Sequence, residues 1–165
     1  RPSMIYGDLC DRNISKFIKM IDRNRIMPVI NGGKSLIQPV NARDLGKAFY
    51  DVLMSPEKTS GKTYDLSGDR PVQIIDVLKL IAKNLNKERK FINIPISIGV
   101  FISEVTKLFS LGKFDYVEKV LRMTEDRSYS HELASIDFAY GPMSIETGIQ
   151  IEVEQYLFVK RRKGW

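Results

Sequence analysis

The sequence has 165 residues and a formal net charge of +6, with 43% hydrophobic and 28% charged residues. A chain of this length can bury a hydrophobic core, and its ordinary composition without internal repeats excludes a disordered chain or a solenoid. The single cysteine, Cys10, excludes an internal disulfide framework and a cysteine-rich zinc site. We therefore expect one domain, or a large piece of one, in a reducing compartment such as the cytoplasm.

The net charge comes largely from one run near the end of the sequence. The four consecutive basic residues at 160–163 belong to a total of 26, and the other basic residues nearly balance the 20 acidic ones. Such a run can bind polyanions or anionic lipid, but a solvated basic tail over 160–165 is the simpler interpretation. We expect no nucleic-acid partner.

One apolar stretch, 91–111, is a candidate for membrane contact. Pro95, Gly99, Glu104 and Lys107 interrupt it, whereas a spanning helix needs about 20 largely uninterrupted apolar residues. We expect no membrane span. A buried helix is favoured over a lid helix that rests on a membrane surface.

The first elements follow one another closely. The opening RPSMIYG indicates the end of a buried strand before a turn at Gly7, so we expect that further sequence precedes it. Asn13 then suits the cap of an amphipathic helix, with Asp22 off its apolar face. Short strands at 28–30 and 36–40 flank Asn-Gly-Gly and resemble a hairpin.

The remaining elements alternate between helix and strand. They are expected as a helix capped by Asp44 that ends before Pro56, a strand at 63–66, a helix at 72–85, a strand at 90–94, a helix at 96–109, a short helix from Ser130 or His131, and a last helix from Ser144. This alternation indicates an α/β fold. The strands are too few and too short for a complete doubly wound sheet.

Four segments in this order resemble the C-terminal half of the extended short-chain dehydrogenases/reductases, the NAD-dependent epimerases and dehydratases of nucleotide-sugars. They are RPSMIYG at 1–7, LIQPVNARDLGKA at 36–48, YDLSGDRPVQIIDVLKLIAKNL at 64–85 and DFAYGPMSIETGIQIEVEQYL at 137–157. The resemblance implies the C-terminal, substrate-binding portion of that α/β fold, with an incomplete Rossmann core. Residues 1–66 would contain the elements that join a missing N-terminal Rossmann domain. A narrower similarity, carried by DRNISKFIKMI and Gln-Pro-Val, points to epimerases of polysaccharide biosynthesis.

The resemblance also implies a set of site residues. Pro2 and Ser3 would contact the edge of the cofactor. Residues implied or suited to contact the substrate are Met4, Tyr6, Arg12, Asn13, Lys16, Gln38 and Arg122. Arg12, Lys16 or Arg122 could supply positive charge to a diphosphate, because guanidinium and ammonium groups bind that anion.

Some of these residues have a structural alternative, and some positions depart from the family pattern. Tyr6 either lines the sugar pocket or fills an interface, and Asn13 and Lys16 either bind an anion at a helix start or act as an ordinary cap and a solvated lysine. In the family, an asparagine is common at the position of Met4, an arginine at Ile37, a histidine at Asn41 and an aspartate at Arg43. These departures leave the substrate open.

The catalytic motifs of the family are absent from the sequence. Gly32-Gly33 has no further glycine at the spacing of a dinucleotide-binding turn. Tyr156 and Lys160 have the spacing of the family's Tyr-x-x-x-Lys pair but fall in the last helix, where we interpret the spacing as coincidence. The parent protein would use NAD or NADP, while this chain alone is expected to bind neither and to be inactive.

No metal site is expected. His131 is interpreted as an exposed residue at a helix start, and Asp44, Asp65 and Asp69 as cap, strand-end and turn residues.

The leading hypothesis is thus the substrate-recognition part of a nucleotide-sugar epimerase, dehydratase or reductase. Its partners would be the nucleotide-sugar and the missing Rossmann domain, and a homodimer is left open. The alternatives are a non-catalytic structural or binding relative of the same fold and a polyanion-binding module driven by the basic run.

Overall fold

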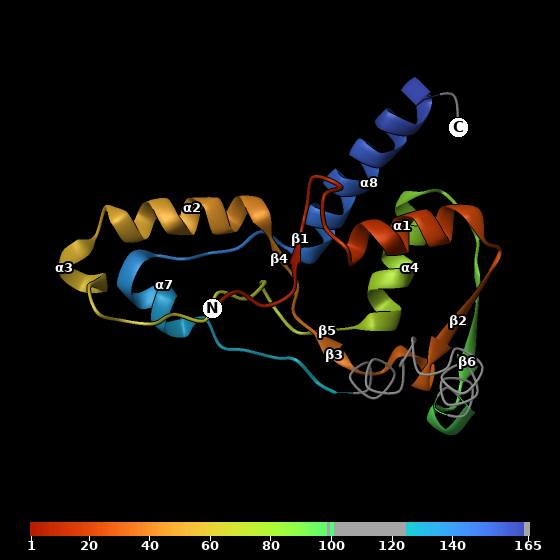
Figure 1. The fold of residues 1–165 in the computed structure, drawn as a ribbon, viewed down its shortest axis with the longest axis horizontal. Coiled ribbons are helices and arrows are strands. Elements are labelled where there is room, and N and C mark those ends of the chain that lie inside the picture. The colour runs from red at the N-terminus through yellow and green to blue at the C-terminus, as the bar shows by residue number, and fades with distance from the viewer. Residues whose placement is uncertain (99, 101–124, 164–165) are drawn as a thin grey trace, which may run out of the picture.

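The computed structural model describes residues 1–98, 100 and 125–163, which form a body and an arm on either side of a central crossing of strands (Figure 1). The body contains α1 (Ile14–Arg23), α4 (Ile74–Asn84) and α8 (Ile145–Lys163), and the arm contains α2 (Ala42–Leu53), α3 (Pro56–Thr59) and α7 (Glu132–Phe138). The strands are β1 (Ile5–Tyr6), β2 (Ile26–Ile30), β3 (Leu36–Ile37), β4 (Val40–Asn41), β5 (Val72–Gln73) and β6 (Lys90–Ile94). The α/β class expected from the sequence is confirmed.

The short strands pair across long sequence distances. Among the described residues, β1 pairs in parallel with β4, β2 in parallel with β6, and β3 antiparallel with β5. The hairpin expected between β2 and β3 is therefore wrong. The strand expected at 63–66 is reduced to a bridge between Pro2 and Leu66.

The turn after β2, η1 (Asn31–Gly33), explains why no hairpin forms. Gly32 and Gly33 have backbone φ angles of 62° and 66°, values that residues with a side chain rarely adopt. A Cβ on Gly33 would lie 2.8 Å from Val29 Cγ1 and 2.9 Å from the backbone nitrogen of Ile75. The turn therefore packs against the start of α4 and sends the chain away from β2.

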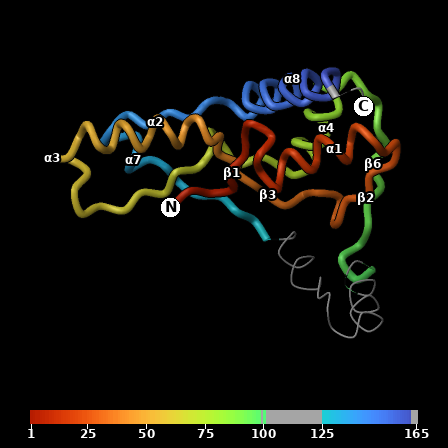
Figure 2. Tube along the Cα trace, turned by 45° about the horizontal axis from the view of Figure 1, so that its top comes forward, coloured from red at the N-terminus to blue at the C-terminus, as the bar shows by residue number. Residues whose placement is uncertain are grey.

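The body is held together by the apolar faces of its helices. Figure 2 shows α8 lying across α4 and α1. Phe17, Ile75 and Leu157 were predicted to face inward and are only partly buried, whereas most of the other apolar residues predicted to face inward are buried. They are Ile14, Ile18 and Ile21 from α1, Val77, Leu78, Ile81 and Ala82 from α4, and Ile145, Ile149 and Val153 from α8. Burying a large aliphatic side chain contributes about 2 kcal/mol, so this cluster dominates the stability of the body.

A second, smaller core lies in the arm. It joins α2 and α7 to the extended segment that contains Tyr64 and Leu66. The Phe138 ring meets the Tyr64 ring edge to face, with centroids 5.0 Å apart. The arm is thus one layer of helices on a single extended segment.

The helix starts differ from the sequence predictions in two places. Asn41, rather than Asp44, caps α2, because its Oδ1 accepts from the backbone N–H of Arg43 at 3.0 Å. The Asn13 side chain makes no cap bond; the Asp11 carboxylate accepts from the backbone N–H groups of Asn13 and Ser15 at 2.7 and 3.2 Å. Ser144 caps α8 as predicted, with Oγ accepting from the N–H of Thr147 at 3.2 Å.

The basic run is part of α8 through residue 163, so it continues the helix instead of forming a separate tail, and Arg161 and Arg162 are exposed to solvent as expected. The Lys160 ammonium donates to Asp22 at 2.6 Å. No helix in the described part of the chain is long and apolar enough to cross a membrane. The helix expected at 96–109 lies largely outside the described residues.

Candidate functional site

The four segments that carry the family resemblance contact one another. Tyr6 of the first segment packs on Gly148 of the fourth, where an added Cβ would lie 1.8 Å from the tyrosine Oη. Gly68 of the third segment packs equally closely against Pro39 of the second segment, because a Cβ added to Gly68 would lie 2.0 Å from the Pro39 carbonyl oxygen. The two glycines are therefore required for close packing.

Two hydrogen bonds complete this arrangement. The Asp44 carboxylate accepts from the backbone N–H of Met143 at 3.1 Å, joining the second segment to the fourth. Tyr140 Oη donates to the Ser67 carbonyl at 3.0 Å, joining the fourth to the third. The segments thus form one packed unit, although they are separated in the sequence.

A groove of about 1110 Å³ runs beside the first segment, and it contains five of the predicted site residues. Pro2, Ser3, Met4, Asn13 and Gln38 all line it. The groove is also lined by Arg1, Ile5, Ile37, Asp65, Glu125, Asp126, Arg127 and Tyr129. Among the described residues, this groove therefore brings together most of the predicted site residues.

Two of the polar residues in the groove are engaged by the protein itself. Ser3 Oγ donates to the Gln38 carbonyl at 2.5 Å. Gln38 is 4% exposed; its Nε2 donates to the Gly68 carbonyl, and its Oε1 accepts from the backbone N–H of Tyr129, both at 2.8 Å. Gln38 therefore ties the two walls of the groove together.

Replacing Gln38 with alanine is expected to remove both bonds and leave the Gly68 carbonyl and the Tyr129 N–H unpaired. Each unpaired buried group costs about 1–3 kcal/mol, so the free energy of unfolding should fall by about 3 kcal/mol. Denaturant unfolding measures this loss. Gln73→Ala, at an exposed position, is the control and should change stability by less than about 0.5 kcal/mol.

The other predicted site residues do not line this groove. Tyr6 is 1% exposed, and burial raises its pKa above the ordinary value for tyrosine. Its position against Gly148 agrees with the alternative that it fills an interface. Arg12 and Lys16 are exposed, and Arg122 lies outside the described residues, so their roles toward a substrate stay predictions.

Sequence reasoning missed the charged wall of the groove. The Asp126 carboxylate accepts from the N–H of Leu36, and the backbone N–H of Arg127 donates to the Leu36 carbonyl, both at 2.8 Å. These bonds bring residues ninety positions apart to one edge of the groove. A pattern along the sequence carries no signal for such a contact.

His131 lies at the start of α7, as predicted, but it is partly buried rather than exposed. Its Nδ1 is 2.9 Å from Ser67 Oγ, and its ring meets the Tyr140 ring edge to face. No group of three or more His, Cys, Asp or Glu side chains within the described ranges could hold a metal ion.

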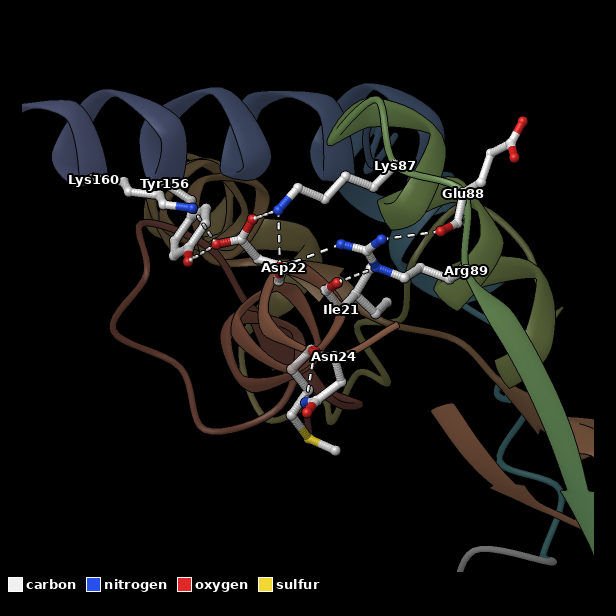
Figure 3. A network of polar contacts seen from close by, with 9 residues as sticks. Ile21, Asp22, Asn24, Lys87, Glu88, Arg89, Tyr156 and Lys160 are labelled. Atoms are coloured by element: carbon white, nitrogen blue, oxygen red, sulfur yellow. Dashed lines mark hydrogen bonds and ion pairs between the residues drawn. The ribbon is translucent and has the colours of Figure 1, made fainter. Parts of the chain in front are cut away.

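Tyr156 and Lys160 converge on one buried carboxylate outside the groove (Figure 3). The Asp22 side chain is 3% exposed and accepts from Lys160 Nζ at 2.6 Å, from Tyr156 Oη at 2.8 Å and from Lys87 Nζ. Burial alone would raise the pKa of Asp22, but the bonds from Lys160, Lys87 and Tyr156 hold it well below its usual range. The prediction that Asp22 lies off the buried face is wrong.

The same cluster closes the C-terminal end of α1. Lys87 Nζ donates to the Asp22 carbonyl at 2.8 Å, and Arg89 Nε donates to the Ile21 carbonyl at 2.6 Å (Figure 3). Cations are favourable at this end of a helix, where carbonyl groups lack partners. The pair Tyr156 and Lys160 thus serves a structural ion cluster.

No protein-family model and no curated protein matches the sequence. Solved structures do resemble the fold. Gox2253 matches with a TM-score of 0.75 and a sequence identity of 14%, and the match covers 98% of this chain and 49% of gox2253. The epimerase Mth375 of Methanothermobacter thermautotrophicus matches with a TM-score of 0.72 and an identity of 13%, and the match covers 99% of this chain and 44% of Mth375. The dTDP-glucose 4,6-dehydratase of Bacillus anthracis, solved with NAD, matches with a TM-score of 0.68 and an identity of 17%, and the match covers 98% of this chain and 44% of the dehydratase.

These likenesses show the fold. The chain has the α/β fold of about half of each of these structures, in agreement with the fold that the sequence resemblance predicted. It spans about half the length of the structures that it matches.

Proposed function

We propose that the chain is the substrate-recognition part of an NAD(P)-dependent nucleotide-sugar epimerase, dehydratase or reductase. The main support for this proposal is the groove of about 1110 Å³, which is lined by Pro2, Ser3, Met4, Asn13 and Gln38 from separate segments. The likeness to a dTDP-glucose dehydratase solved with NAD supports this choice of substrate and cofactor class. The cytoplasm remains the expected compartment.

The partner of the groove would be an N-terminal Rossmann domain, to which the elements of residues 1–66 would be joined. The exposed apolar surface of the arm supports this proposal, since large apolar patches mark interaction surfaces. Its members are Phe49, Tyr50, Leu53, Met54, Leu133 and Ile136, of which Leu53 is 77% exposed. An N-terminal domain packed against the arm would cover these side chains.

The chemistry would require that partner. Pro2 and Ser3 would border bound NAD or NADP, which would supply the hydride exchange with the sugar. The described residues supply the groove that orients the substrate, while no residue of the chain is assigned as acid or base. The chain alone is proposed to be inactive.

A second candidate is a non-catalytic structural or binding relative of the same fold. Met4 and Ile37 favour it, because both line the groove where the family commonly has polar residues. Loss of polar contacts weakens recognition of a diphosphate. A homodimer is compatible with both candidates.

Binding of nucleotide-sugars tests the proposal. A screen of UDP- and dTDP-sugars should raise the unfolding temperature, because a ligand present at about 100 times its Kd stabilises a protein by about 2.7 kcal/mol. Arg127 lines the groove with its guanidinium 3.9 Å from Glu125 and would also donate to the phosphate. Arg127→Gln should weaken the affinity by about 10- to 100-fold, since a charge-assisted bond to phosphate contributes about 1.5–3 kcal/mol.

Arg162→Gln is the matched control, because Arg162 is exposed at the far end of α8. It should bind like the unmodified protein. No stabilisation by any nucleotide-sugar, or equal weakening by both arginine substitutions, would contradict a binding role for the groove.

A further inference from the structure

Glu152, in the middle of α8, is 1% exposed. Its carboxyl oxygens form no well-aligned hydrogen bond among the described residues, although the Asp11 side chain and the backbone N–H of Leu9 are close enough to act on them. An ionised carboxylate is very unfavourable in such a place, so the group takes up a proton instead. Burial raises its pKa to about 9, and Asp11 and Asp8 add to the effect.

The loop between β1 and α1 faces this carboxyl and has an unusual backbone. Gly7, Asp8 and Leu9 have φ of 129°, 55° and 60°. Two successive non-glycine residues in the left-handed region are strained and persist only where the surroundings hold them. The loop therefore needs supports outside itself.

Two side chains hold the loop through Asp8. Gln155 Nε2 from α8 donates to Asp8 Oδ1 at 2.9 Å, and Arg43 Nη2 from α2 donates to the same oxygen at 2.8 Å. Gln155 Oε1 is buried and has no partner in the described part of the chain. Glu152 and Gln155 lie on the same face of α8, since residues three apart on a helix are neighbours.

The remaining groups that face Glu152 are acidic or neutral. Asp8 and Asp11 act on it from the loop, and Glu152 in turn acts on the buried hydroxyl of Tyr6 in β1. Ionisation would thus place a buried negative charge beside two carboxylates. Repulsion of this kind at low dielectric favours movement of the loop.

We propose that protonated Glu152 is a pH-dependent latch: it lies on α8 between Gly148, which contacts Tyr6, and Gln155, which bonds Asp8, its neutral carboxyl lets the loop Gly7–Asp11 keep its strained conformation, and loss of its proton to solvent releases the loop. The latch stands apart from the proposed function. It has a consequence for the groove, because the loop leads directly into Asn13, which lines it. Glu152 would be a positioning residue for that side chain.

A carbon-detected NMR titration of the protein tests the latch. The Glu152 carboxyl carbon should titrate with a midpoint near pH 9, compared with its ordinary value of 4.5. The backbone carbons of residues 8–11 should shift with the same midpoint. In Glu152→Gln, which stays neutral, the loop resonances should keep their neutral-pH positions through that range.

Glu154→Gln is the matched control, because Glu154 is exposed on the same helix; the loop transition should remain. A Glu152 midpoint near 4.5, or loop resonances that do not change at the Glu152 midpoint, overturns the latch. If Glu152→Gln fails to fold, Asp11→Asn replaces it: removing that charge should move the transition to lower pH, and an unchanged midpoint overturns the proposal.

Discussion

Asp22→Ala is expected to destabilise the protein by about 3 kcal/mol, because removing one partner of a buried ion pair leaves the other charges uncompensated. Lys87 and Lys160 lose their common acceptor, and their side chains are about one-third exposed, so water offsets part of the cost. The end of α1 and the last turns of α8 should loosen together. Urea unfolding and hydrogen exchange of these two segments measure the effect.

Asp51→Ala is the control for Asp22. Asp51 also accepts from a lysine, Lys47, at 2.6 Å, but that lysine is 70% exposed. The change should cost less than about 1 kcal/mol. Equal losses for the two substitutions would contradict a special role for the buried cluster.

The Asp22 cluster also predicts a dependence on pH. Since the pKa of Asp22 is held below its ordinary value, its contribution is present above about pH 4 and is lost as the pH falls below it. Asp22→Asn should remove this part of the acid sensitivity. Thermal unfolding between about pH 2 and 6 measures the difference.

Gly148→Ala is expected to destabilise the protein by about 3 kcal/mol, because the new methyl group would overlap the Tyr6 ring. The added Cβ would lie 1.8 Å from Oη and 2.8 Å from Cζ of Tyr6. The ring is 1% exposed and has little room to move. Circular dichroism during urea unfolding measures the loss.

Gly46→Ala is the matched control, because a Cβ at Gly46 of α2 meets nothing within 4 Å. Alanine favours a helix over glycine by about 1 kcal/mol, so this change should be neutral or stabilising. Adding Tyr6→Phe to Gly148→Ala should recover part of the stability, since the closest atom is the hydroxyl oxygen. A destabilising Gly46→Ala, or no recovery in the double variant, would contradict the packing argument.

The helices of the body were predictable because their determinants are local. The apolar residues of α1, α4 and α8 recur with the helical period, and the structure buries them as expected. The strand partners were not predictable. β2 pairs with β6, whose residues come 64 positions later in the sequence, and strands this short carry no information about their partner.

The candidate site was predictable in part, through the family resemblance. Five of its residues line one groove, but Gln38 is also a buried structural link and Tyr6 is fully buried. The sequence could not reveal this, because burial depends on residues such as Tyr129 and Gly148 that lie far away in the chain. Asp22 was misplaced for the same reason.

The most direct test of the proposed function is conversion of a nucleotide-sugar by the protein when it is joined to the proposed cofactor-binding domain. With oxidised NAD or NADP the substrate should be converted to an epimer or a dehydrated product, and with the reduced cofactor to a reduced sugar, seen by NMR of the sugar; Arg127→Gln should require more substrate for the same rate. Tight binding of a nucleotide-sugar without conversion in the presence of either cofactor, oxidised or reduced, would contradict an enzymatic role and favour the non-catalytic relative.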